Sequence, residues 1–379
     1  MHLPHVVDCH AHLDSGLLAD GAFGLHQMLA RCERYAVRAV VFSVYFDLTT
    51  GQLELPVDQI LAAAAQHESV RLGVSLGVCP PVAAIPPATL DRQLEGATRA
   101  ARQLADAGHV VAIGEVGLDY YWPIVEFLKS QGVLDWQQIG DQMRDRQEQL
   151  LAEPRVRDCL QTQAVVFQAC IELAAHTELP LVIHGRDAYA DILRMLAVAD
   201  IDPHDVVLHC FAGTVEEAME AESRGFLISI PSSVGYRKKF ADVAQRVDLT
   251  RLVIETDSPY HSPFVGQWQA ARDIARQQAV PDSLSRDGRK QWLAEQQLEL
   301  FLSEVERRYP ELTFAVLRNG HPRTVSARDH LSHDVNRRQN EPAFVRCAAT
   351  DIATLKHVDL RDVCAATTAN ARHLFPRVF

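Results

Sequence analysis

The stretch Val6-Val7-Asp8-Cys9-His10-Ala11-His12 starts with β-branched residues typical of a buried strand and ends on two histidines. The same order, an apolar run followed at once by a residue that can bind a metal ion, occurs at four further places, which end on Glu115, His184, His209 and Asp257. Residues that follow parallel strands converge on one face of a (β/α)8 barrel, where enzymes of this fold build their sites. We therefore predict one active centre formed by His10, His12, Glu115, His184, His209 and Asp257.

Eight short apolar runs have the length and composition of strands in a parallel sheet. Five of them precede the predicted ligands, and the other three span Ala39–Tyr45, Leu72–Val78 and Phe226–Ile230. Helical patterns lie between the strands, at Leu25–Ala36, Leu90–Ala107, Val166–His176, Ala188–Ala199, Val215–Arg224 and Lys239–Val247. This alternation predicts an α/β fold, and the count of eight favours a closed (β/α)8 TIM-type barrel over an open sheet. No Gly-x-Gly-x-x-Gly motif follows the first strand, which argues against a dinucleotide-binding fold.

Two polar stretches interrupt the alternation and lengthen the chain beyond the roughly 250 residues typical of this barrel. We expect a barrel core over residues 1–264, an insertion within it at 122–161, a second insertion at 266–338 and a closing segment of the barrel at 339–379. Apolar residues recur at helical spacing over Gly288–Glu306, which predicts that the second insertion is partly helical. Insertions between a strand and the following helix lie on the catalytic face.

The net charge of -12 excludes a protein that coats nucleic acid through overall basicity. A local basic surface is compatible with it, because Arg186 and the run Arg237-Lys238-Lys239 are expected on the same barrel face as the ligands. Arg186, Lys238 and Lys239 are therefore candidates for binding substrate. The alternative for the run is a solvated helix start.

The eight cysteines form no Cys-x-x-Cys pair, a pattern that favours buried free thiols in a reducing compartment. The start of the chain lacks a charged region followed by a long apolar stretch, and no run of about 18 apolar residues occurs. We expect a cytoplasmic protein without a membrane span.

The ligand types indicate the chemistry of the predicted centre. With 17 histidines, roughly one His-x-His pair arises by composition alone, so the pair His10 and His12 gains its weight from the other four residues. Imidazole and carboxylate ligands without thiolate suit two divalent ions, Zn²⁺, Mn²⁺ or a mixed pair, and suit Mg²⁺ less well. One carboxylate between two sets of ligands can bridge ions about 3.5 to 4 Å apart. Cys9 and Cys210 flank the ligands and are interpreted as packing residues.

Five blocks of sequence, in this order, resemble the signature segments of TatD-type metal-dependent deoxyribonucleases within the amidohydrolase superfamily. They are Asp8–Asp14, Gly114–Tyr120, Ile183–Ala188, His209–Thr214 and Glu255–Tyr260. Asn340-Glu341-Pro342 and the terminal Thr367–Phe375 resemble the closing segments of that family. The likeness covers residues 1 to about 264 and about 338 to 379 and leaves both insertions unexplained.

The resemblance implies roles for individual residues. His10, His12 and Asp257 would hold one ion, His184 and His209 a second, and Glu115 would bridge them. Asp257 would also accept a proton from the attacking water, so Asp257 and Glu115 are the candidate catalytic residues. Arg186 would hold a substrate phosphate. Glu255 would contact a third ion or pair with a basic neighbour, and we favour pairing.

One position departs from the family pattern. Where the family has Gly-x-His-Pro, this chain has Gly77-Val78-Cys79-Pro80, so a histidine near the substrate phosphate or an accessory metal is missing.

The sequence therefore predicts metal-dependent hydrolysis of phosphodiester bonds in DNA, on a single strand or an accessible end. One alternative is an amidohydrolase-type enzyme that acts on a small amide, lactone or phosphoester, since the same ligands activate water for several electrophiles. Another is a partner-binding subunit of a DNA-processing assembly with vestigial catalysis. The 266–338 insertion, with His321, His330 and His333, is expected to act as a lid or to dock a protein partner, against the alternative of a surface excursion without function.

Overall fold

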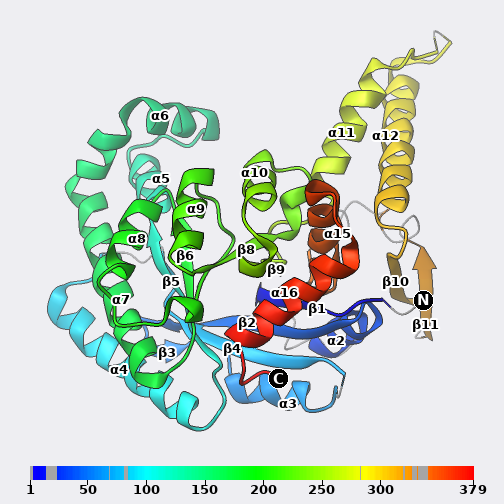
Figure 1. The fold of residues 1–379 in the computed structure, drawn as a ribbon. Coiled ribbons are helices and arrows are strands. Elements are labelled where there is room, and N and C mark those ends of the chain that lie inside the picture. Colours follow the sequence, from blue (N-terminus) through cyan, green and yellow to red (C-terminus); the bar gives the residue numbers. More distant parts are fainter. Residues whose placement is uncertain are drawn as a thin grey trace.

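The strands form a parallel barrel that is nearly closed (Figure 1). The computed structural model describes residues 3–13, 24–67, 69–80, 84–281, 283–318, 321–326, 331 and 340–379. Within this part of the chain the order of the strands is β1 (Val6–His12), β2 (Val37–Asp47), β4 (Arg71–Gly77), β5 (Ala112–Asp119), β6 (Leu181–Arg186), β7 (Val206–Leu208), β8 (Leu227–Pro231) and β9 (Leu252–Glu255). Hydrogen bonds from His12 N to Ser258 O (2.7 Å) and from Asp257 N to His10 O (3.0 Å) join the first strand to the segment after the last. The predicted TIM-type barrel is confirmed.

Helices cover the outside of the barrel. They are α2 (Leu25–Arg34), α3 (Val57–Ala64), α4 (Pro87–Asp106), α7 (Pro154–Thr177), α8 (Tyr189–Leu196), α9 (Val215–Ser223), α10 (Lys238–Arg246), α15 (Val345–Lys356) and α16 (Leu360–Leu374). The strands are buried on both faces, which explains why their sequences read as continuous apolar runs. The short strand β3 (Gln52–Leu53) lies antiparallel to the end of β2.

The interior of the barrel is filled at the amino-terminal ends of the strands. Alternate strand residues point inward there, such as Val7, Val182 and Val253, and they pack against Phe375 and Val378 from the end of the chain. Arg71, the first residue of β4, donates to the carbonyl oxygen of Val378 (3.3 Å). The residues after α16 therefore seal the end of the barrel opposite the predicted ligands.

Several strands are longer than the sequence indicated. His10, His12, Glu115 and His184 were expected just after strands, but they lie inside β1, β5 and β6. The reason is that pairing resumes after two register shifts, one between Asp8 and Ala11 and one between Gly114 and Val116. Such bulges turn individual side chains out of the regular alternation, here those of His10 and Glu115.

The first insertion is helical. It forms α5 (Tyr121–Ser130), α6 (Trp136–Ala152) and the first part of α7, which begins at Pro154 and not at Val166 as the sequence pattern suggested. Ile124, Leu128, Ile139, Leu150 and Val156 belong to a separate apolar cluster in this segment. The insertion therefore stabilises itself through its own small core.

The second insertion contains α11 (Val265–Gln277), α12 (Arg286–Arg308) and the hairpin of β10 (Thr313–Arg318) and β11 (His321–Ser326). Phe301 and Val305 at the end of α12 are buried in the main core, and the Tyr309 hydroxyl donates to the buried Asp351 carboxylate of α15 (2.9 Å). His330 and His333, like Asp14, lie outside the described residues. The base of this insertion is thus part of the barrel's core.

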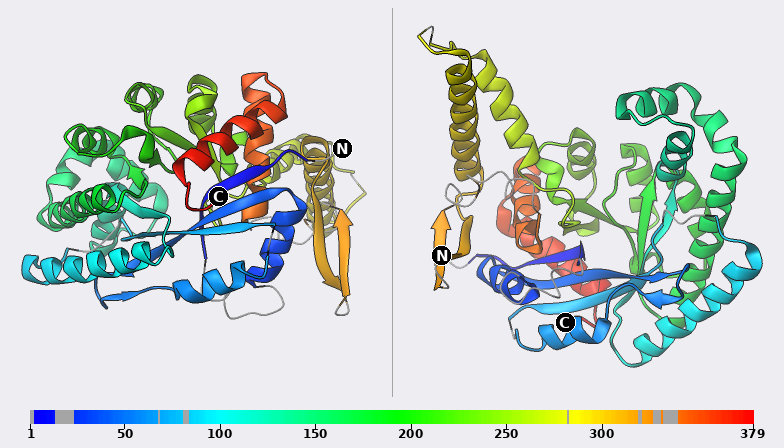
Figure 2. Two further views of the ribbon diagram at one scale, coloured as in Figure 1. Left: turned by 60° about the horizontal axis from the view of Figure 1, so that its bottom comes forward. Right: turned by 180° about the vertical axis from the view of Figure 1, so that it is seen from behind.

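Both insertions rise from the same end of the barrel and stand on opposite sides of it (Figures 1 and 2). α5 and α6 lie on one side, and the paired α11 and α12 project farthest on the other. Among the described helices, none combines the length and the apolar character needed to cross a membrane.

Candidate metal centre

The structure brings all six predicted ligands together at the carboxyl-terminal ends of five strands. β1 carries His10 and His12, β5 carries Glu115, β6 carries His184, and His209 and Asp257 follow β7 and β9. His10, Glu115, His209 and Asp257 are buried, whereas His12 and His184 are partly exposed. The cluster is therefore open to solvent on one side.

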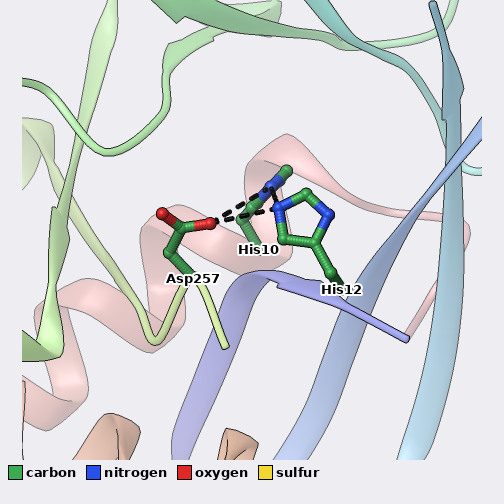
Figure 3. Close-up of side chains that lie close together, drawn as sticks. All are labelled: His10, His12 and Asp257. Carbon is green, nitrogen blue, oxygen red and sulfur yellow. Dashed lines mark hydrogen bonds and ion pairs between the residues drawn. The ribbon is translucent and has the colours of Figure 1, made fainter. Parts of the chain in front are cut away.

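The first half of the cluster contains His10, His12 and Asp257 (Figure 3). The Nε2 atoms of the two histidines lie 3.2 Å apart, and His12 Nε2 lies 3.1 Å from Asp257 Oδ1. His10 Nε2 lies 3.9 Å from the same oxygen and 3.3 Å from Glu115 Oε2. Two imidazole nitrogens and two carboxylates thus point at one small volume.

Glu115 faces two sides. Its Oε2 atom is turned toward His10 and His12, while its Oε1 atom lies 2.7 Å from His184 Nδ1 and 3.1 Å from His209 Nε2. The latter two nitrogens are 3.4 Å apart. Each carboxylate oxygen of Glu115 therefore belongs to a different group of imidazoles.

The ligand atoms lie about as far apart as the ligands of a bound metal ion. In a tetrahedral zinc site with bonds of about 2.0 to 2.2 Å to nitrogen and oxygen, neighbouring ligand atoms lie about 3.3 to 3.6 Å apart. The measured separations among the ligand atoms range from 2.7 Å for His184 to Glu115 up to 3.9 Å for His10 to Asp257. Imidazole nitrogens held this close to one another also require a cation between them, either a proton or a metal ion. Imidazole and carboxylate groups at these separations suit divalent metal ions.

The charged states of the buried carboxylates and histidines of the cluster depend on one another. Burial alone would raise the pKa of Glu115, but the charge of His209 and hydrogen bonds from the surrounding histidines hold that pKa well below its usual range. Burial likewise opposes the charged form of His209, yet Glu115 and Glu255 raise its pKa well above the usual value. An imidazole that binds a metal ion must be neutral, so metal binding displaces the proton that Glu115 and Glu255 favour on His209.

Three further residues support the ligands, and sequence reasoning assigned no such role to the first two. Asp119, at the end of β5, accepts from His184 Nε2 at its Oδ2 atom (3.1 Å) and from the backbone N–H of Trp122 at its Oδ1 atom (2.8 Å). The Tyr45 hydroxyl donates to Glu115 Oε2 (2.6 Å). Glu255 Oε1 lies 3.4 Å from His209 Nδ1, which matches the favoured interpretation of Glu255 as a pairing residue. Asp119 lies in the segment Gly114–Tyr120 that resembles the family, and its place at the end of a strand was the signal in the sequence.

We expect Asp119→Asn to weaken metal binding by about 10- to 100-fold, the usual cost of losing a carboxylate that orients a ligating histidine. The amide cannot offer His184 the charged acceptor that fixes its ring. Competition with a chelating dye would measure the affinity. Asp187→Asn serves as the control, because Asp187 is exposed and lies beside Arg186 without a ligand contact in the described structure. Equal affinities of the two variants would show that Asp119 is not needed for orientation.

The candidate substrate residues differ in their placement. Arg186 is two residues beyond His184 on β6, so both side chains leave the strand on the same side. Its guanidinium carbon lies 3.9 Å from the ring centre of Tyr121. Lys238 and Lys239 are exposed at the start of α10, and Lys238 pairs with Asp242 (2.5 Å). This placement fits the alternative interpretation of the run as a solvated helix start. Within the described residues neither lysine contacts a predicted ligand.

Comparisons with known proteins agree with the fold and with a metal-dependent hydrolase. A family model described as TatD related DNase matches residues 7–376. A Mycobacterium tuberculosis protein described as the metal-dependent hydrolase TatD is 30% identical over 260 residues, 68% of this chain and 81% of that protein. A Citrobacter koseri protein described as the 3'-5' ssDNA/RNA exonuclease TatD is 36% identical over 106 residues, 27% of this chain and 41% of that protein. The crystal structure of a TatD family hydrolase from Entamoeba histolytica has a TM-score of 0.59 at 17% identity and covers 99% of both chains, which shows a shared fold.

Proposed function

Because this chain belongs to the family of TatD-related DNases and is a metal-dependent hydrolase, we propose that it hydrolyses phosphodiester bonds of DNA. The proposed substrate is a single strand or an accessible end, in keeping with the name of the Citrobacter koseri relative as an exonuclease of single-stranded DNA and RNA. When bound, the two ions would polarise a phosphoryl oxygen and lower the pKa of water.

One observation carries the proposal, the position of Glu115 between two groups of imidazoles. A carboxylate shared in this way holds two ions close together, and paired ions suit the displacement of an alkoxide from a phosphodiester. We propose that His10, His12 and Asp257 hold one ion and that His184 and His209 hold the other, with Glu115 shared. The carboxylate of Asp257 would accept the proton of the attacking water.

Support for a nucleic-acid substrate comes from a row of aromatic rings and cations beside the cluster. Arg186 lies over Tyr121 and, at 5.5 Å, over Trp122, and Lys129 Nζ lies 5.7 Å from the ring centre of Trp122 and 5.0 Å from that of Trp136. Lys129 also pairs with Glu126 (3.0 Å). The outermost ring, Trp136, is 55% exposed. Aromatic rings next to cations are the usual contacts of unpaired bases and their phosphates.

We expect Arg186→Ala to lower kcat/KM for phosphodiesters by about 10- to 150-fold, which corresponds to the roughly 1.5 to 3 kcal/mol of a hydrogen bond to a charged group. The metal content should not change, because Arg186 is not a ligand. Arg194→Ala is the matched control, since Arg194 is an exposed arginine of α8 that pairs with Asp191. Unchanged kinetics with DNA, or an equal loss with an uncharged ester, would assign Arg186 a structural role.

The direct test uses chelated protein reloaded with Mg²⁺, Mn²⁺ or Zn²⁺ and end-labelled single-stranded or double-stranded DNA. We expect metal-dependent shortening of the single strand, visible as a product ladder. If metal-loaded protein hydrolyses a small amide, lactone or phosphoester but leaves every DNA substrate intact, the amidohydrolase alternative replaces the proposal. If metal binds and no substrate is hydrolysed, the vestigial alternative does.

The projecting part of α11 and α12 is our candidate for a lid or for docking a protein partner. Because the base of α12 is buried in the core, we expect only the tip, residues 276–290, to be replaceable by a short Gly/Ser linker without loss of folding; the described residues of this tip, 276–281 and 283–290, are mostly exposed. Hydrolysis of a small phosphodiester should then persist, while processing of long DNA or recruitment of a partner is lost. The measurement is the rate of hydrolysis of the small phosphodiester and of long DNA, in the variant and in the parent protein. If the variant hydrolyses both substrates at the rates of the parent protein, the tip is not a lid.

A further inference from the structure

Cys210, His261 and Asp257 form a cluster of metal-binding side chains at the edge of the six predicted ligands. Their ligand atoms all lie within 4.8 Å of one another. Cys210 Sγ lies 3.5 Å from His261 Nε2, and His261 Nε2 lies 3.6 Å from Asp257 Oδ2. In a tetrahedral zinc site with a thiolate at about 2.3 Å and nitrogen or oxygen at about 2.0 to 2.2 Å, neighbouring ligands are about 3.3 to 3.7 Å apart. The two separations from His261 Nε2 therefore match those between neighbouring ligands of such a site.

The second carboxylate oxygen of Asp257 faces this cluster. Its Oδ1 atom is turned toward His10 and His12, and the other oxygen points away from both histidines (Figure 3). That second oxygen, Oδ2, is the one that faces His261. Asp257 thus has the same two-sided arrangement as Glu115, with a different group of ligands on each side.

The ring of His261 is held in the orientation that a ligand needs. Its Nδ1 atom lies 2.8 Å from Ser233 Oγ, so the hydroxyl can accept an Nδ1–H hydrogen bond while Nε2 faces Cys210 and Asp257. Metal-binding histidines commonly donate their other ring N–H to such a neighbour. The Ser232 hydroxyl donates to the carbonyl oxygen of His261 (2.9 Å) and fixes the backbone of the same loop.

The backbone at all three residues is unusual. Cys210, Asp257 and His261 have φ angles of 42°, 52° and 54°, in the left-handed region that side chains other than glycine rarely adopt. Such conformations persist where the surroundings impose them, and they concentrate at functional sites. Here they occur together at the three residues whose ligand atoms converge.

We propose that Cys210, His261 and Asp257 hold a third ion, Zn²⁺, distinct from the two ions shared by Glu115. The sulfur ligand selects a thiophilic ion over Mg²⁺ or Mn²⁺. Binding replaces the thiol proton of Cys210, which passes to solvent, and forms a bond between sulfur and zinc. His261 and Cys210 are only partly buried, so an ion can reach them. The sequence interpretation of Cys210 as a packing residue is revised accordingly, and this site does not depend on the substrate being DNA.

Cobalt titration of the chelated protein tests the proposal, with metal alone as the probe. Co²⁺ bound only by nitrogen and oxygen gives no thiolate-to-metal charge-transfer band, whereas Co²⁺ on Cys210 gives one in the near ultraviolet. We expect this band in the parent protein and three zinc ions per chain by elemental analysis. Cys210→Ser and His261→Leu should each lose the band and bind two zinc ions.

Cys79→Ser is the matched control, because Cys79 is an exposed thiol that follows β4 at the same end of the barrel. Its variant should keep both the band and the third ion. A parent protein that binds two zinc ions and shows no band would overturn the proposal, and the cluster would then be a hydrogen-bonded Ser233–His261–Asp257 chain. Loss of the band in Cys79→Ser, with the band kept in His261→Leu, would overturn it too. His261→Leu leaves Cys210 in place, so a folding defect of Cys210→Ser alone does not block the test.

Discussion

Turnover of the Asp257→Asn variant is expected to fall by at least about 10² to 10⁴-fold, the usual contribution of a general base. The amide neither accepts the proton of water nor supplies a negative ligand between His12 and His261. Asparagine tolerates the left-handed backbone that Asp257 adopts, so the substitution tests chemistry without adding backbone strain. The measurement is kcat on a small activated phosphodiester after metal reloading, together with the midpoint of thermal unfolding.

Asp351→Asn provides the contrast for this prediction. Asp351 is also a buried carboxylate, but it accepts from Arg308 Nε (2.7 Å) and the Tyr309 hydroxyl, far along the chain from the ligands. Its variant should lose stability and keep its turnover per folded molecule. If Asp257→Asn retains turnover within about tenfold of the parent protein, Asp257 is not the base.

Glu115→Gln should be at least as damaging and should also reduce the number of bound ions. The carboxylate is the one group with an oxygen in each half of the cluster, and the amide nitrogen of glutamine cannot serve as a ligand. Loss of the negative charge also leaves the surrounding imidazoles without the carboxylate that stabilises a cation among them. Elemental analysis after dialysis measures the ions per chain.

The control for Glu115→Gln is Glu341→Gln. Glu341 accepts two hydrogen bonds of 2.8 Å from Arg31 Nε and contacts none of the six ligands in the described part of the chain. Its metal content should equal that of the parent protein. Two ions bound to Glu115→Gln with undiminished affinity would rule out the shared role of Glu115.

The barrel and the convergence of the six ligands could be predicted because both depend on local sequence. Each ligand stands beside an apolar run, and parallel strands bring such positions together whatever the lengths of the helices between them. The ends of the strands were less predictable, since the bulges beside His10 and Glu115 depend on pairing with neighbouring strands. The early start of α7 depends on the separate apolar cluster that α5 and α6 supply.

The supporting residues escaped sequence reasoning for a related reason. Tyr45 lies on β2 and reaches Glu115 on β5, and His261 gains its neighbours from Ser233 and Cys210, which belong to other segments. A single tyrosine or histidine carries no mark of such a contact in its own surroundings. Asp119 could be predicted in part. Its place at the end of a strand follows from the sequence, whereas its contact with His184 does not.

The apolar cluster that fills the amino-terminal end of the barrel affects how the chain folds during synthesis. Val7 and Cys9, near the beginning, share one interior cluster with Phe375 and Val378, near residue 379. Contacts of such long sequence separation form slowly, and here they cannot form until the ribosome has added the last of these residues. The interior at this end of the barrel therefore stays unfilled until Phe375 and Val378 have been made, and its closure comes late in folding.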